Sequence, residues 1–122
     1  MNPKEFDTKE YMFWFVRTLA ENVALMHKSG YVHGYLTAHN VTTDCRIMDL
    51  DSVRHMEHVS GEEFEKIREK DMESIIGGPK RPGLLYGFST WLSGVPRVEG
   101  VDVPIAKELI EEFNNIYRQN SG

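Results

Sequence analysis

Apolar side chains recur at helical spacing near the start of the chain, and this pattern predicts a helix from about Thr8 to Lys28. Asp7 is placed to cap its first turn, because Glu10 follows at the spacing of a capping box. Gly30 provides a stop, since glycine tolerates the left-handed conformation that follows many helices. The apolar face of this helix consists of Met12, Val16, Leu19, Ala20, Val23 and Met26.

The pattern then changes to short extended pieces. Residues 40–43 and 46–48 predict two small strands joined by a turn at Asp44 and Cys45. A second helix is expected to begin after Ser60, because Ser60 and Glu63 have capping-box spacing. It should end at the Gly-Gly-Pro sequence 77–79. Phe64, Ile67, Asp71 and Ile75 are expected to lie on one face of this helix.

Residues 77–100 contain most of the glycine and proline and predict a loop, with one short helix near Ser89. A last helix is expected from about Pro104 to Arg118, capped by Asp102, with a stripe of Ile105, Leu109, Phe113 and Ile116. The order of elements therefore predicts a mainly helical α+β fold, in which a small β-hairpin lies between helices. The 122 residues fit a single domain, 1–122.

Composition narrows the classes of function. The formal net charge is -5, so we expect no nucleic-acid partner. No apolar run approaches the roughly 20 residues that cross a bilayer, and no signal peptide is recognisable, so a cytoplasmic protein without membrane association is expected. The single cysteine, Cys45, excludes an intramolecular disulfide.

One stretch carries candidate chemistry. It reads His-Gly-Tyr-Leu-Thr-Ala-His-Asn over residues 33–40, and Asp49-Leu50-Asp51 follows. Protein kinases carry H-R-D-L-x-x-x-N and then D-F-G, and aminoglycoside-type kinases carry H-G-D-x-x-x-x-N and then an aspartate pair. His33, Leu36 and Asn40 match at the same offsets, and residues 26–32 resemble the lead-in to that motif. The chain thus resembles a kinase-like C-lobe, with a catalytic-loop-like region at 27–53 and a helical part at 60–119.

The resemblance implies a role for each matched residue. Asn40 and Asp49 would hold Mg²⁺ for ATP, because hard oxygen ligands suit that ion, and Asp51 would be a further ligand, as in the aminoglycoside-type branch. His33 would be structural, packing under the loop and bonding to the backbone near Asp49. The alternative is that Asn40, Asp49 and Asp51 are turn-forming residues, since Asn and Asp cap backbone groups in loops, and this plain structural use is the stronger expectation.

Two departures bear on activity. Tyr35 stands where the family has its catalytic aspartate, and a phenol, mostly protonated at neutral pH, is a poor general base. No N-lobe with a glycine-rich strand pair precedes Phe6. Residues 70–74 resemble the start of a kinase helix whose buried aspartate braces the catalytic loop. Because the predicted helix stops at Gly77, however, we expect Asp71 at an ordinary solvated position, with the brace as the alternative.

These features lead to three hypotheses. The first is a kinase-like C-lobe module without catalytic competence on its own, either a pseudokinase-type binding protein or part of a split kinase. Its partner would be another protein or a second copy, docking on the first helix, where Tyr11, Trp14 and Phe15 add apolar surface. The second is an atypical phosphoryl- or nucleotidyl-transferase that uses Mg-ATP, with an N-lobe supplied elsewhere; selenoprotein O-type AMP transferases also lack the usual aspartate. The third is a small α+β scaffold of unknown function.

Overall fold

The structure is a computed structural model, and it describes residues 8–37, 40–42, 44–78, 83–86 and 104–121. Its elements are α1 (Thr8–Lys28), β1 (Tyr31–Val32), the 3₁₀ turn η2 (Leu50–Ser52), β2 (Arg54–His55), α2 (Gly61–Ile76) and α4 (Pro104–Ser121). The described residues are mainly helical with one small two-stranded sheet, which confirms the mainly helical α+β class. No described helix is both long and apolar enough to cross a membrane.

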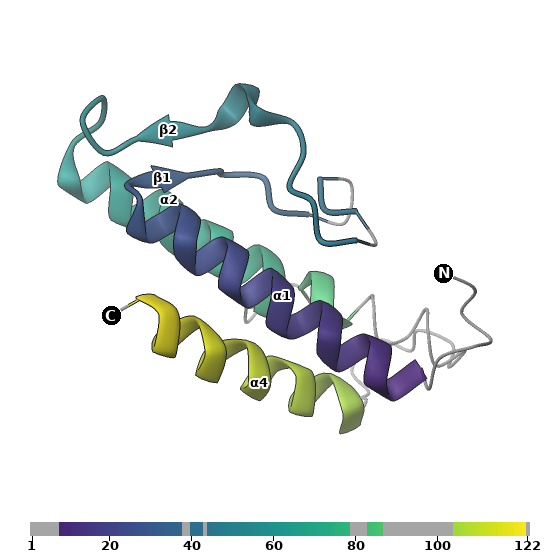
Figure 1. The fold of residues 1–122 in the computed structure, drawn as a ribbon. Helices are drawn as coiled ribbons and strands as arrows, with labels where there is room; N and C mark the ends of the chain where they lie inside the picture. Colours follow the sequence, from purple (N-terminus) through teal and green to yellow (C-terminus); the bar gives the residue numbers. More distant parts are fainter. Residues whose placement is uncertain (1–7, 38–39, 43, 79–82, 87–103, 122) are drawn as a thin grey trace.

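α1 is the central element (Figure 1). α4 packs along α1 and runs in the same direction (Figure 1). α2 runs in the opposite direction to α1 (Figure 1). The loop segments that carry β1, β2 and η2 cover the side of α1 and α2 that faces away from α4 (Figure 1). This arrangement places the described residues between 31 and 55 on a helical support.

One hydrophobic core joins these elements, and the predicted stripe of α1 supplies much of it. α1 contributes two adjacent buried rows, which is why it packs against α4 and against the loop side at once. At the edge of the α1–α4 interface, Arg17 forms an ion pair with Glu112 at 3.0 Å. The fully buried large apolar side chains include Leu19, Val23, Leu36, Ile75, Leu85, Leu109 and Phe113.

The helix boundaries follow local signals. α1 and the start of α2 match the prediction, and the Ser60 hydroxyl accepts a hydrogen bond from the Glu63 N–H at 3.1 Å, as a capping box requires. Gly30 and Gly77 both have positive φ, at 90° and 91°, where each helix gives way to loop. α4 continues three residues beyond the predicted end, to Ser121. The predicted caps Asp7 and Asp102 lie outside the described residues.

The strands differ from the prediction. Residues 40–43 and 46–48 do not form two strands: Val41 and Ile47 make one isolated antiparallel bridge, with a turn in which Cys45 donates its N–H to the Thr42 carbonyl. The two-stranded sheet instead pairs Tyr31 with His55 and Val32 with Arg54. The predicted short helix near Ser89 lies outside the described residues, and most of the predicted loop 77–100 does as well.

Candidate functional site

The candidate site is organised by the carboxylate of Asp71. Asp71 lies on the inner face of α2 and is fully buried, so the expectation of a solvated position is wrong. Its Oδ2 accepts a hydrogen bond from the His33 N–H at 2.9 Å, and its Oδ1 accepts one from the Gly34 N–H at 2.6 Å. A buried carboxylate is costly unless such donors surround it. Asp71 therefore fixes the backbone at residues 33–34. This agrees with the alternative prediction for Asp71, in which its carboxylate braces the loop.

Two further side chains extend this arrangement to α4. His27, near the end of α1, is buried, and its Nε2 lies 2.9 Å from Oδ2 of Asp71. An ionised carboxylate only accepts, so Nε2 carries the proton, and in a neutral ring Nδ1 then accepts from the Tyr117 hydroxyl at 2.7 Å. The network thus joins α4, α1, α2 and the loop.

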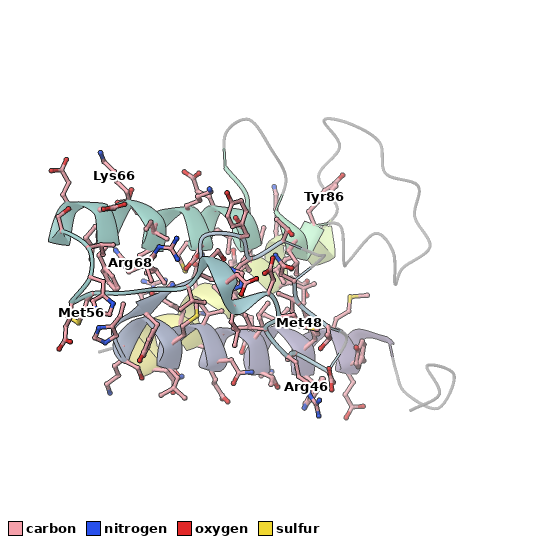
Figure 2. The ribbon with its side chains drawn as sticks, turned by 90° about the horizontal axis from the view of Figure 1, so that it is seen from above. Arg46, Met48, Met56, Lys66, Arg68 and Tyr86 are labelled. Atoms are coloured by element: carbon pink, nitrogen blue, oxygen red, sulfur yellow. The ribbon has the colours of Figure 1, made fainter. Side chains whose placement is uncertain are left out.

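Arg68 marks the outer end of the same network. The pKa of its guanidinium is raised, mainly by the hydrogen bond to Glu65 and secondly by a hydrogen bond to Tyr117. Arg68 extends from α2 toward α1, whereas Lys66 points away on the other side of α2 (Figure 2). Because every polar atom at the centre has a partner, the network is a stabilising one.

His33 ties this support to the second half of the motif. It is fully buried, its Nε2 donates to the Met48 carbonyl at 2.8 Å, and its Nδ1 accepts from the Tyr35 N–H at 3.0 Å. Both ring nitrogens of His33 are thus engaged in hydrogen bonds to the backbone of neighbouring segments. The resemblance implied a hydrogen bond from His33 to the backbone near Asp49, and the Met48 carbonyl belongs to the residue directly before Asp49.

Asn40 and Asp49 are brought together by the bridge between their segments. The Met48 N–H donates to the Asn40 carbonyl at 2.7 Å, so Met48 lies opposite Asn40 across the bridge. Asp49 is the next residue after Met48. The Asn40 Nδ2 donates to the Tyr35 carbonyl at 2.8 Å, which fixes the amide and leaves its Oδ1 as the remaining acceptor. Asn40 thus links the two sides of the loop.

The two aspartates after this bridge are exposed. Asp49 has φ 57° and ψ 69°, a left-handed backbone that is uncommon for a residue other than glycine. Asp51 lies in η2, and its backbone carbonyl accepts from Arg54 at 3.3 Å. Among the described residues no group of three or more His, Cys, Asp or Glu side chains is arranged to hold a metal ion. Magnesium ligation by Asn40, Asp49 and Asp51 therefore stays a prediction.

Tyr35 occupies the position of the usual base. Its side chain is 55% exposed, and the Lys70 ammonium lies 4.5 Å from the centre of its ring, at cation–π distance. The structure thus presents a phenol to solvent, with a cation beside it, directly after the two backbone amides that Asp71 binds.

No family model, no curated protein and no solved structure matches the chain. The contacts of the site itself are therefore the basis for any functional conclusion.

Sequence reasoning missed the roles of His27 and Tyr117 and underrated Asp71. A signal for Asp71 was present, because it shares a helix face with Ile67 and Ile75, and a carboxylate inside an apolar stripe needs buried donors. Tyr117 lies four residues after Phe113 and belongs to the buried stripe of α4. Its partner His27 is 90 positions earlier, which no local pattern indicates.

Proposed function

We propose that this chain is a kinase-like C-lobe module without catalytic competence on its own, acting as a pseudokinase-type binding or regulatory unit or as one part of a split kinase. The observation that carries the proposal is the pair of hydrogen bonds from the His33 and Gly34 backbone to the buried Asp71 carboxylate. The resemblance implied such a brace from a distant part of the sequence, 38 residues from His33.

The bond from His33 to the Met48 carbonyl supports the same conclusion. It joins the loop that begins at His33 to the segment that ends at Asp49, and the resemblance required that connection independently of the brace. A small scaffold with an accidental motif has no reason to satisfy both. We therefore favour a kinase-like module over a scaffold of unrelated origin.

The chemistry at Tyr35 supports a non-catalytic role. A general base has to accept the proton of the attacking hydroxyl within hydrogen-bond reach. Tyr35 offers a phenol, and the Lys70 cation beside its ring adds no acceptor. Asn40, Asp49 and Asp51 keep oxygen atoms that suit Mg²⁺, so Mg-ATP binding without transfer is compatible with the proposal.

The proposed partner is another protein or a second copy of this chain, docked on α1. Phe15 does not belong to the docking surface, because it is buried in the core. Trp14 and Leu25 are 44% and 64% exposed, and their separation of 11 positions, about three helical turns, puts them on one outer face of α1. Sedimentation velocity of the wild type and of Trp14→Ser over a concentration range tests self-association through this face.

Label transfer from [γ-³²P]ATP and [α-³²P]ATP with Mg²⁺ tests the central claim. We expect no transfer by the wild type to itself or to added protein and sugar acceptors, and the same result for Asp49→Ala. Transfer that is lost in Asn40→Ala and Asp49→Ala but kept in Glu69→Gln, a change at an exposed position of α2, would overturn the proposal. It would favour the atypical phosphoryl- or nucleotidyl-transferase instead.

A further inference from the structure

A pocket with no role in the proposed function opens beside Tyr35. It has a volume of about 240 Å³ and lies between residues 33–35, the side chains of Ser52 and Arg54, and the side of α2 that faces this loop. Arg54 and Lys70 line it together with Tyr35, and Ile67 adds an apolar wall. Two cations therefore share one concave surface.

Neither of these two cations is neutralised by an ion pair with a described residue. The sequence has 19 acidic and only 14 basic residues, so basic side chains are expected to find carboxylates. In the part of the chain that the structure describes, neither Arg54 nor Lys70 has a carboxylate at ion-pair distance. Four other described cations do, namely Arg17 with Glu112, Arg46 with Asp44, Lys66 with Glu62 and Arg68 with Glu65, whereas Lys28 and Arg118 also lack a described carboxylate partner. Uncompensated positive charge in a pocket favours an anionic ligand.

Arg54 is held in place for such a ligand. Its backbone pairs with Val32 in the two-stranded sheet, and its Nη1 donates to the carbonyls of Asp51 and Val53 at 3.3 and 3.1 Å. The other guanidinium N–H groups stay available. A fork with fixed orientation matches the oxygen atoms of a phosphate or carboxylate group.

Lys70 and Tyr35 complete the lining. The ammonium of Lys70 sits over the Tyr35 ring at 4.5 Å, which limits where this flexible side chain places its charge. The Tyr35 hydroxyl is a neutral donor on the same loop. Kinases carry an aspartate at the position of Tyr35, and a carboxylate there would repel an anion. A tyrosine at this position therefore favours anion binding, although it is a poor general base.

We propose that this pocket binds the phosphate group of a small phosphorylated molecule. Two cations without ion pairs match a dianionic phosphate group better than they match a carboxylate, which carries a single charge. The pocket volume of about 240 Å³ is room for a phosphate and a few more heavy atoms. Ile67 offers an apolar contact to that remainder. Glu63 also lines the pocket and opposes the anion.

Titration of the ¹⁵N-labelled chain with phenyl phosphate at constant ionic strength tests this proposal. We expect saturable shifts of the Gly34, Tyr35, Arg54 and Lys70 amides, and weaker or no binding of benzoate, which carries one charge. Losing one charge-assisted contact in Arg54→Met or Lys70→Met should weaken binding by about tenfold. Glu63→Gln should strengthen it.

Lys66→Met is the matched control. Lys66 lies one helical turn before Lys70 but points away from the helix pair and is paired with Glu62 (Figure 2). Because both pocket cations are exposed, the variants should retain the wild-type amide spectrum, and Arg54→Lys and Lys70→Arg should keep part of the affinity. Unsaturable shifts, equal weakening by Lys66→Met, or benzoate binding as tight as phenyl phosphate would each overturn the assignment. None of these outcomes depends on phosphoryl transfer by the chain.

Discussion

Asp71 accepts a hydrogen bond of 2.9 Å from the backbone N–H of His33, which lies 38 positions earlier in the chain. Two more donors, the Gly34 N–H and the His27 ring, complete the surroundings of the buried carboxylate. A single side chain of α2 thus replaces the water that two loop amides would otherwise need. The loop depends on α2 for its shape, and α2 depends on the loop to keep a charge buried.

Replacing Asp71 should therefore be costly. In Asp71→Asn, one acceptor oxygen becomes an NH₂ group that faces other donors, and removing one side of a buried charged network destabilises a protein by about 3–5 kcal/mol. Urea denaturation followed by circular dichroism measures the free energy of unfolding. Hydrogen exchange of the His33 and Gly34 amides should accelerate more than exchange in the middle of α4.

Glu69→Gln is the control for this prediction. Glu69 is an exposed carboxylate on the same helix, two positions earlier, and its loss should change the free energy of unfolding by no more than about 0.5 kcal/mol. Equal effects of the two substitutions would show that the Asp71 carboxylate does not support the loop.

Tyr117→Phe tests whether α4 takes part in the same network. The substitution keeps the ring, which stacks on Phe113 with 6.2 Å between centroids, and removes the hydroxyl bonded to His27. An unsatisfied ring nitrogen in the interior should cost about 1–3 kcal/mol in the free energy of unfolding. Nitrogen-15 shifts of the His27 ring report whether its tautomer preference is lost.

Tyr31→Phe provides the comparison, since Tyr31 is 44% exposed and makes a ring contact with His55. We expect this variant to unfold at the wild-type denaturant concentration and to leave the His27 signals in place. A His27 ring unchanged in Tyr117→Phe would contradict the hydrogen-bond order described for the network.

The helices were predictable because their signals are local. Capping residues, glycine stops and apolar spacing all lie within a few positions of the boundary that they set, as at Ser60 and Gly77. The strands were not predictable, because each has only two residues and because β1 pairs with β2, which begins 23 positions after the start of β1. The apparent hairpin at 40–48 reduces to one bridge, and alternation over three or four residues does not distinguish these outcomes.

The site was predictable only in part for the same reason. The motif located His33, Asn40 and Asp49 on neighbouring segments, and local hydrogen bonds indeed join those segments. The donors that allow Asp71 to be buried come from the loop and from α1, so its burial depends on tertiary structure. The solvated position expected for Asp71 was inferred from the shortness of the predicted helix, and helix length does not tell whether buried donors surround the carboxylate.

Phe113→Ala should strongly weaken the α1–α4 interface. Phe113 is fully buried in the shared core, and truncating such a side chain costs about 3–5 kcal/mol through lost burial and the cavity that remains. Thermal unfolding measures the loss. Asn115→Ala, at an exposed position of the same helix, should stay near the wild type. A small effect of Phe113→Ala would mean that α4 does not pack on α1 in solution.

The buried thiol of Cys45 predicts a dependence of stability on alkaline pH. The pKa of this thiol is raised from 9.0 to about 12, mainly by burial and secondly by the negative charge of Asp44. Above pH 9 the unfolded chain therefore loses the thiol proton while the folded chain keeps it. The contribution of Cys45 to stability is complete below pH 9 and declines toward pH 12, by at most about 1.4 kcal/mol per pH unit.

Urea denaturation of the wild type and of Cys45→Ala at pH 8, 9, 10 and 11 measures this contribution together with a smaller one from Tyr11, whose pKa is raised by burial and secondly by the charge of Cys45. The difference between the two free energies of unfolding should be constant up to pH 9 and shrink above it. The Cys45 thiol donates to the Phe15 carbonyl at 3.3 Å inside the core, so iodoacetamide should modify it only as fast as the chain opens. Rapid alkylation of the folded protein at pH 8 would show that the turn around Cys45 leaves the thiol accessible.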